Sequence, residues 1–215
     1  MAALLTKALL AYLLGSVIGS LLLGRLRGVD IRTMGSGNPG ATNALRTQGM
    51  KVGLTVLAID MAKGWVATGL LAGWALPVGS APAALAPWSA PVCGVAVILG
   101  HLYPLWFGFR GGKGVATFVG ALLGLNAWLL LVFVLSFFGS VILLGFVGLG
   151  SILGAVAVAI AAACGNFPDR LPLLAFAVIA MLLILYKHRA NLARMHAGTE
   201  PRAMRLWLFG TRRTG

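Results

Sequence analysis

The sequence predicts an all-α fold, a polytopic integral membrane bundle of about seven transmembrane helices with an extracytoplasmic N-terminus and a cytoplasmic C-terminus. Of its 215 residues, 60% are hydrophobic and only 10% are charged, whereas a soluble domain carries about 25% charged residues. Apolar segments long enough to cross a bilayer recur along the whole chain. We therefore expect one membrane-embedded domain over residues 1–215.

The charge balance excludes one kind of chemistry. Only four acidic residues stand against 17 lysines and arginines, which gives a net charge of +13. The acids are Asp30, Asp60, Asp169 and Glu200. A site that holds Mg²⁺ with several carboxylates needs more acids close together than these. The sequence therefore predicts an enzyme or binding protein for anions, with no metal and no cofactor.

Long apolar segments give the order of the expected helices. No charge interrupts the chain between Lys7 and Arg25, and this length is just enough for one crossing of a ~30 Å hydrocarbon core. The second segment is unusual because Asp60 and Lys63 lie one turn apart, a spacing that allows an ion pair. The third contains His101, which we interpret as structural. The spans expected outside the long uncharged region are 8–24, 52–76, 92–107 and 171–186.

Positive charge predicts the topology. Most lysines and arginines fall in three places, the loop 25–51, the loop 108–114 and the tail 187–215. Cytoplasmic loops collect Lys and Arg, so we expect all three to face the cytoplasm. The N-terminus and the polar stretch 77–91 would then lie outside.

The same argument divides the uncharged region 114–168. An even number of spans must separate residue 113 from residue 187 if both lie on one side, and 171–186 supplies one of them. The region 114–168 must therefore supply an odd number, and its length favours three short helices over one. We expect the outer turn at Asn126 and the cytoplasmic break at the small residues Gly148-Leu149-Gly150-Ser151.

A glycine-rich stretch in the first basic loop is a candidate phosphate site. It reads Gly35-Ser36-Gly37-Asn38-Pro39-Gly40-Ala41-Thr42-Asn43, with Arg46 shortly after it. A segment of this composition does not readily form a helix or a strand. Glycines let the backbone approach a ligand, and successive amides in a turn form a concave anion site. The competing interpretation is a plain linker between two helices.

The other two basic segments also carry polar detail. Lys113 lies in Gly111-Gly112-Lys113-Gly114 before an expected helix, which suits an anion although the loop is not a Walker A motif. In the tail, His188, Asn191 and Arg194 are spaced by three residues, so one face of a helix could present all of them.

These three blocks carry a resemblance to a known family. The 35–43 stretch with Arg46, the segment from His101 to Thr117, and the segment from His188 to Glu200 resemble, in this order, the sequence blocks of the bacterial acyl-phosphate-dependent glycerol-3-phosphate acyltransferases, the PlsY family. Asp60 with Lys63 resembles a further signature. Nine consecutive residues in the first block make the match specific, and it runs from the first span to Arg202.

The resemblance implies a reaction and its setting. The family transfers a fatty acyl group from acyl phosphate to the 1-hydroxyl of sn-glycerol 3-phosphate, giving lysophosphatidic acid and inorganic phosphate, the first acylation of phospholipid synthesis. It implies a multi-pass protein of the bacterial cytoplasmic (inner) membrane with its active site on the cytoplasmic face. The expected partners are the two substrates and membrane lipid, with no nucleic acid, and the expected state is a monomer.

The resemblance and the chemistry of a mixed anhydride together suggest roles for the residues. Phosphate is already a good leaving group, so the enzyme must chiefly position two anions and stabilise an oxyanion. Ser36, Thr42 and the loop amides would hold phosphate or the oxyanion, Arg46 and Lys113 would neutralise charge, and Asn191 would hold glycerol phosphate. His188 would orient or deprotonate the hydroxyl, a task that a substrate phosphate oxygen could perform instead. The remaining expected substrate-binding residues are Gly35, Gly37, Asn38, Gly40, Asn43, Gly112 and Glu200, and, from the parity argument alone, Ser151.

Three other mechanisms or functions fit the sequence less well. Direct transfer is preferred to an acyl-enzyme on Ser36, because no obvious base and orienting carboxylate accompany that serine. The soluble acyltransferases need His and Asp five positions apart, which none of the three histidines offers. The alternative from another class is a transporter or channel for a phosphorylated anion. Transporters tend to show internal repeats and a mid-membrane site, and we find no repeat here.

Overall fold

The computed structural model describes residues 1–77, 82–204 and 206–209, and these residues contain helices and no strand. Expectations for 78–81 of the polar stretch, and for 205 and 210–215 of the tail, lie outside the described residues. The chain forms two compact units, 1–126 and 127–215, which we describe separately. The all-helical class expected from the sequence is confirmed.

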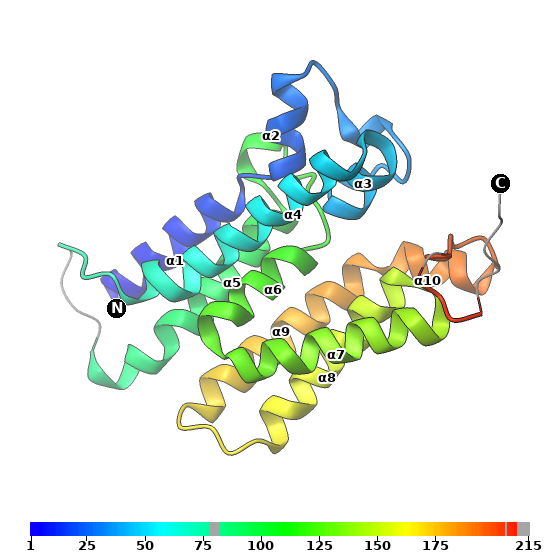
Figure 1. The fold of residues 1–215 in the computed structure, drawn as a ribbon. Helices are drawn as coiled ribbons and strands as arrows, with labels where there is room; N and C mark the ends of the chain where they lie inside the picture. Colours follow the sequence, from blue (N-terminus) through cyan, green and yellow to red (C-terminus); the bar gives the residue numbers. More distant parts are fainter. Residues whose placement is uncertain (78–81, 205, 210–215) are drawn as a thin grey trace. The chain divides into compact units, whose positions relative to one another are not determined.

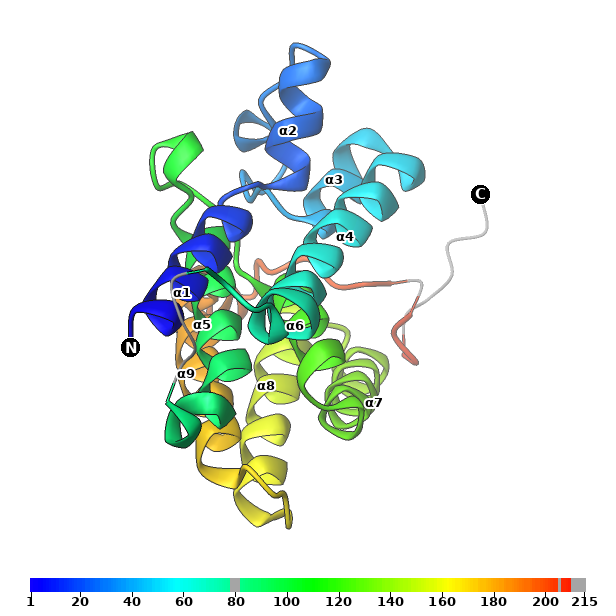
Figure 2. The same cartoon turned by 90° about the vertical axis from the view of Figure 1, so that its left-hand side faces the viewer.

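The first unit contains six α-helices with short 3-10 and π turns in its described part. Its elements are α1 (Ala2–Gly15), α2 (Gly19–Leu26), η1 (Ile31–Thr33), α3 (Ala41–Gln48), α4 (Met50–Trp65), η2 (Val66–Leu70), η3 (Leu71–Gly73), η4 (Ala83–Trp88), α5 (Ser89–Leu102), η5 (Leu105–Phe107) and α6 (Val115–Leu125). Within this unit α1 runs beside α5, and α4 packs on both α3 and α6 (Figures 1 and 2). Close packing of α4 and α6 depends on small residues, since a Cβ at Gly64 would overlap the carbonyl oxygen of Thr117.

The second unit contains the helices α7 (Ala127–Leu144), α8 (Val147–Cys164), α9 (Arg170–Lys187) and α10 (Arg189–His196). In this unit α8 packs on α7 and on α9, and the short α10 contacts both α8 and α9 (Figure 1). Gly154 of α8 packs where a side chain would press on Phe133 of α7. Small residues of α8 therefore let its neighbours approach closely.

Five helices of the described residues are long and apolar enough to cross a membrane. They are Met50–Gly73, Ala83–Phe107, Ala127–Leu144, Val147–Cys164 and Arg170–Lys187. The pair α1 and α2, bent by 47°, can count as a sixth, and α6 is a shorter apolar helix. About seven spans therefore stays a prediction, because it requires both the bent pair and α6 to cross; so does the orientation of the termini.

The first basic loop and the first span differ from expectation. The segment 8–24 is not one straight helix, because α1 ends at Gly15 and α2 begins at Gly19. The stretch 35–43 is not wholly irregular either, since its last three residues start α3. Gly40 precedes this helix with an extended backbone and accepts the first helical hydrogen bond, from Ala44 N–H at 3.0 Å.

The uncharged region 114–168 contains three helices, as expected, while the crossing of the membrane by all three stays a prediction. Asn126 is the residue between α6 and α7, so the expected turn is confirmed, while its outer location stays a prediction. The expected break at 148–151 is wrong, because these residues belong to α8. The chain turns instead at Gly145, whose φ of 80° ends α7. Gly148 and Gly150 serve packing, since added Cβ atoms would lie 3.2 Å from Asn191 Cβ and 2.8 Å from Val141 Cγ2.

Candidate active site

The glycine-rich stretch of the first unit is held in shape by one of its own side chains. Asn43, only 2% exposed, accepts a hydrogen bond from the Ser36 N–H at 3.0 Å and donates to the Met34 carbonyl at 2.9 Å. Gly35 and Gly37 have φ values of 55° and 70°, which favour glycine. The amide group of Asn43 therefore stabilises the loop, and its contact with substrate stays a prediction.

The rest of this stretch offers groups to an anion. Ser36, Thr42 and Arg46 are exposed, and Thr42 and Arg46 lie four residues apart, on one face of α3. The first amides of a helix have no intrahelical partner and carry partial positive charge. The loop therefore combines a hydroxyl group, helix N-terminal amides and a guanidinium, which together suit a phosphate.

The second glycine loop of this unit, residues 108–114, packs against the end of α5. Gly112 N–H donates to the His101 carbonyl at 3.1 Å, and a Cβ at Gly112 would overlap the His101 ring. Lys113 is half-buried, and Gly114, with a φ of 80°, precedes α6. The expected position of Lys113 just before a helix is confirmed, whereas its contact with an anion stays a proposal.

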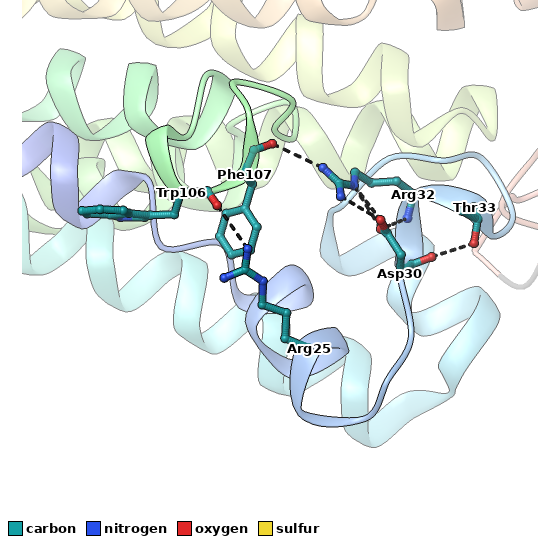
Figure 3. Close-up of polar contacts among 6 residues, drawn as sticks. All are labelled: Arg25, Asp30, Arg32, Thr33, Trp106 and Phe107. Atoms are coloured by element: carbon teal, nitrogen blue, oxygen red, sulfur yellow. Dashed lines mark hydrogen bonds and ion pairs between the residues drawn. The ribbon is translucent and has the colours of Figure 1, made fainter.

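Two arginines tie the loop before Gly35 to the turn before Gly111 (Figure 3). Arg32 forms an ion pair with Asp30 at 2.7 Å and donates to the Phe107 carbonyl at 3.3 Å. Arg25 donates to the Trp106 carbonyl at 3.3 Å and lies 4.5 Å from the centre of the Phe107 ring. The Arg32 guanidinium lowers the pKa of the Asp30 carboxyl below its usual value of 3.8.

Sequence reasoning counted these arginines only as topology charges and missed this tie. The sequence signal for the local part was an acid followed two residues later by an arginine. In the structure Asp30 accepts from both the backbone and the side chain of Arg32. Their long-range acceptors are carbonyls of 106 and 107, and backbone acceptors leave no mark in a sequence.

In the second unit, His188 joins α9 to α10 and is only 3% exposed. Its Nδ1 lies 2.8 Å from the Ile184 carbonyl oxygen. A carbonyl can only accept, so Nδ1 carries a proton in this contact, and in the neutral ring Nε2 carries the lone pair. The junction therefore presents the tautomer that a general base needs.

Asn191 and Glu200 form a brace around the start of α10. Asn191 Nδ2 donates to Glu200 Oε1 at 2.6 Å, and Arg194 Nε donates to Glu200 Oε2 at 2.7 Å. The N–H groups of Thr199 and Glu200 also donate to the Arg194 carbonyl. Glu200 thus holds the chain against α10 and orients the amide of Asn191, while its direct contact with substrate stays a prediction.

Ser151, expected from the sequence to contact phosphate, lies in the second turn of α8. It is 3% exposed, and its Oγ donates to the Val147 carbonyl at 2.9 Å. The hydroxyl oxygen can still accept a hydrogen bond. Gly148, one turn earlier, lets Asn191 approach α8, with a Cβ there lying 3.1 Å from Asn191 Nδ2. Contact between Ser151 and a phosphate stays a proposal.

The structure therefore brings the expected residues together in two groups. In the first unit Arg25 and Arg32, which precede the 35–46 segment, donate to the carbonyls of Trp106 and Phe107, directly before the 108–114 loop. In the second unit His188 and Asn191 share a short helical segment that Glu200 braces.

Comparison with known proteins decides the family. The family model described as "Glycerol-3-phosphate acyltransferase" matches residues 5–198. The chain belongs to the glycerol-3-phosphate acyltransferase family. Among its relatives, the "Glycerol-3-phosphate acyltransferase" of Synechococcus elongatus is 42% identical over 91% of this chain and 92% of its own. That of Geobacter sulfurreducens is 42% identical over 89% of this chain and 93% of its own.

Solved structures give the same answer. The chain is similar to PlsY, an integral membrane glycerol 3-phosphate acyltransferase, in its glycerol 3-phosphate form, with a TM-score of 0.83 and 33% identity over 94% of this chain and 96% of that one. It is also similar to the lysophosphatidic acid form, with a TM-score of 0.81. The family expected from the three sequence blocks is confirmed, and the protein is an integral membrane protein of the PlsY type.

Proposed function

We propose that this protein transfers a fatty acyl group from acyl phosphate to the 1-hydroxyl of sn-glycerol 3-phosphate, releasing lysophosphatidic acid and inorganic phosphate. The observation that carries the proposal is the likeness, over 94% of the chain, to PlsY in forms named for the acceptor and for this product. The exposed Ser36, Thr42 and Arg46 support it, because both substrates carry phosphate.

The phosphate groups are assigned to the basic residues of the first unit. As the acceptor oxygen attacks the acyl carbon, the bond from that carbon to the phosphate oxygen breaks and charge develops on the leaving phosphate. Arg46 and Lys113 would neutralise this charge, and Ser36, Thr42 and the amides of the 35–43 stretch would bind phosphate or the oxyanion. A preorganised loop binds without reorganising during the reaction, which is the physical reason for the Asn43 brace.

His188 is assigned to the acceptor hydroxyl. Its Nδ1 proton is engaged with Ile184, so Nε2 is the atom that would accept the hydroxyl proton. Asn191, oriented by Glu200, would hold glycerol phosphate. A phosphate oxygen of the substrate is the alternative proton acceptor, and a pH profile separates the two.

The membrane setting follows from charge. The loops 25–51 and 108–114 and the tail carry most of the positive residues, so we propose that the reacting groups lie on the cytoplasmic face of the bacterial inner membrane and that the acyl chain enters between helices. A monomer is proposed as the active form.

The test is donor-dependent product formation by purified protein in detergent micelles, with long-chain acyl phosphate or acyl-CoA as donor and glycerol 3-phosphate as acceptor. We expect lysophosphatidic acid and phosphate in equal amounts from acyl phosphate and none from acyl-CoA. Micelles have no compartments, so turnover also distinguishes an enzyme from an anion transporter. No product with acyl phosphate would overturn the proposed function.

A further inference from the structure

A buried polar cluster in the first unit takes no part in the roles assigned so far. It consists of Asp60 and Lys63 on α4 and His101 near the end of α5, which are 1%, 4% and 3% exposed. Lys63 Nζ lies 2.8 Å from Asp60 Oδ1 and 2.8 Å from His101 Nδ1. The sequence predicted the pairing of the first two, which is confirmed, and interpreted His101 as structural. Charged groups are expensive to bury, so a buried cluster of this kind calls for a function.

One side of the cluster holds the break between α1 and α2. Lys63 Nζ donates to the carbonyl oxygens of Gly15, at 3.1 Å, and Val17, at 2.8 Å. Asp60 Oδ1 accepts from the N–H of Gly19, the first residue of α2, at 3.4 Å. A cation thus meets the C-terminal end of one helix and an anion meets the N-terminal end of the next, which satisfies groups that the break leaves without helical partners. The cluster fixes the direction of α2, which leads into the 27–40 loop.

The other side of the cluster supports the second glycine loop. His101 Nδ1 lies 2.8 Å from Lys63 Nζ and 3.5 Å from Asp60 Oδ1. An ammonium only donates, so in its contact with Lys63 the Nδ1 atom accepts and the proton of the neutral ring is on Nε2. This Nε2 edge faces Gly112, where any Cβ would overlap it, and Gly112 N–H donates to the His101 carbonyl at 3.1 Å. The position of Gly112, and with it that of Lys113, is therefore set by His101.

We propose that Asp60, Lys63 and His101 are positioning residues that fix the two phosphate-binding loops of this unit relative to each other. The ion pair sets the start of α2 and hence the approach to Gly35, while the imidazole sets the loop of Lys113. The inference rests on the proposed function in one respect, namely that these loops bind substrate phosphate. It assigns the cluster to substrate affinity, which a role in folding alone would leave unchanged.

Two substitutions at residue 101 separate positioning from folding. His101→Asn keeps an oxygen near the Nδ1 position to accept from Lys63 but removes the ring edge that supports Gly112. His101→Gln keeps a nitrogen near the Nε2 position but removes the acceptor close to the main chain. We expect His101→Asn to keep a Tm near that of the wild type and to raise the KM of a phosphate-bearing substrate about tenfold, with kcat within about threefold. We expect His101→Gln mainly to lower the Tm.

A double-mutant cycle provides the second, independent measurement. Gly112→Ala places a methyl group against the imidazole, and His101→Ala removes the ring that it would meet. If the two substitutions acted independently, their fold-changes in KM would multiply. We expect the KM of the double variant to be at least about fivefold lower than that product.

The outcomes are distinct. Wild-type KM values for both substrates in folded His101→Asn, or strictly multiplicative effects in the cycle, would overturn the positioning role. Failure of the wild type with acyl phosphate would instead overturn the proposed donor. The KM of glycerol 3-phosphate would then be measured with whichever donor supports turnover, so the two failures can be told apart.

Discussion

The glycine-rich stretch 35–43 and the junction between α9 and α10 hold their functional groups in different ways. In the stretch, the main chain carries the shape: Gly35 and Gly37 have positive φ, and the buried Asn43 fixes the Ser36 amide. At the junction, side chains are fixed one by one, His188 by the Ile184 carbonyl and Asn191 by Glu200. A phosphate is bound well by many amides and charges, whereas proton transfer requires one atom in one protonation state. We therefore expect substitutions in the two regions to have different kinetic effects.

The largest effect is expected at the junction. His188→Gln removes the Nε2 lone pair, so kcat should fall by roughly 10²- to 10³-fold while KM stays within about threefold. The variant should also lose the acidic limb of the wild-type pH profile. His196→Gln, an exposed histidine at the end of α10, is the matched control and should retain wild-type rates. A loss below about tenfold with an unchanged pH profile would assign the proton to the substrate phosphate instead.

The second effect tests the backbone character of the 35–43 stretch. Gly35→Ala combines a φ of 55° with a Cβ that would overlap Asn43 Oδ1, so we expect kcat/KM to fall about a hundredfold. Gly28→Ala is the control, because Gly28 has a φ of 66° and open space around it. Its activity should stay within about twofold of the wild type. Equal losses in both variants would mean that backbone strain, and not the Asn43 brace, matters.

A smaller effect is expected from loosening the brace at the junction. Glu200→Gln keeps an acceptor for Asn191 but removes the charge that pairs with Arg194 at 2.7 Å. We expect the KM of glycerol 3-phosphate to rise about threefold to tenfold. In a cycle with Asn191→Ala, the two effects should couple by about 1 kcal/mol, and full additivity would separate Glu200 from Asn191.

The smallest effect concerns the exposed tie between the loops. The lowered pKa of Asp30 means that its ion pair with Arg32 contributes stability above the usual value of 3.8, and this contribution is lost as the pH falls through the lowered folded value. Exposed pairs contribute little. Asp30→Asn should therefore raise KM less than about threefold near pH 7, with no change in kcat. A larger rise in KM, or a fall in kcat, would show that these hydrogen bonds are essential to the site.

The sequence was most informative where hydrophobic runs, loop charges and short spacings carry the signal. Hydrophobic runs and the parity of positive loops gave three helices in 114–168 and a turn at Asn126, and the i, i+3 spacing gave the pair of Asp60 and Lys63. The break of the first span between Gly15 and Gly19 could not be predicted, since its carbonyls are satisfied by Lys63, more than 40 residues away. The break predicted at 148–151 was wrong because small residues occur at close helix packing as readily as at a turn.

The candidate site shows the same limit. The residue types and blocks that bind phosphate were evident, because glycines, hydroxyl groups and basic residues gather in sequence. The sequence did not show which of these residues face a ligand. Asn43 and Glu200 were expected to touch substrate; their side chains hydrogen-bond to the Ser36 amide and to Asn191, and their contact with substrate stays a prediction. Supporting residues have the same polar chemistry as binding residues, and only the coordinates distinguish them.

The most direct test of this division of roles is to ask whether Ser36 ever becomes acylated. Purified protein would be incubated with acyl phosphate alone, quenched and weighed as intact protein by mass spectrometry, and glycerol 3-phosphate would then be added to a parallel sample. If the 35–43 stretch only binds phosphate and His188 acts on the acceptor, the protein mass stays unchanged and lysophosphatidic acid forms only after the acceptor is added. An acyl adduct that is absent in Ser36→Ala and disappears on adding the acceptor would contradict the account.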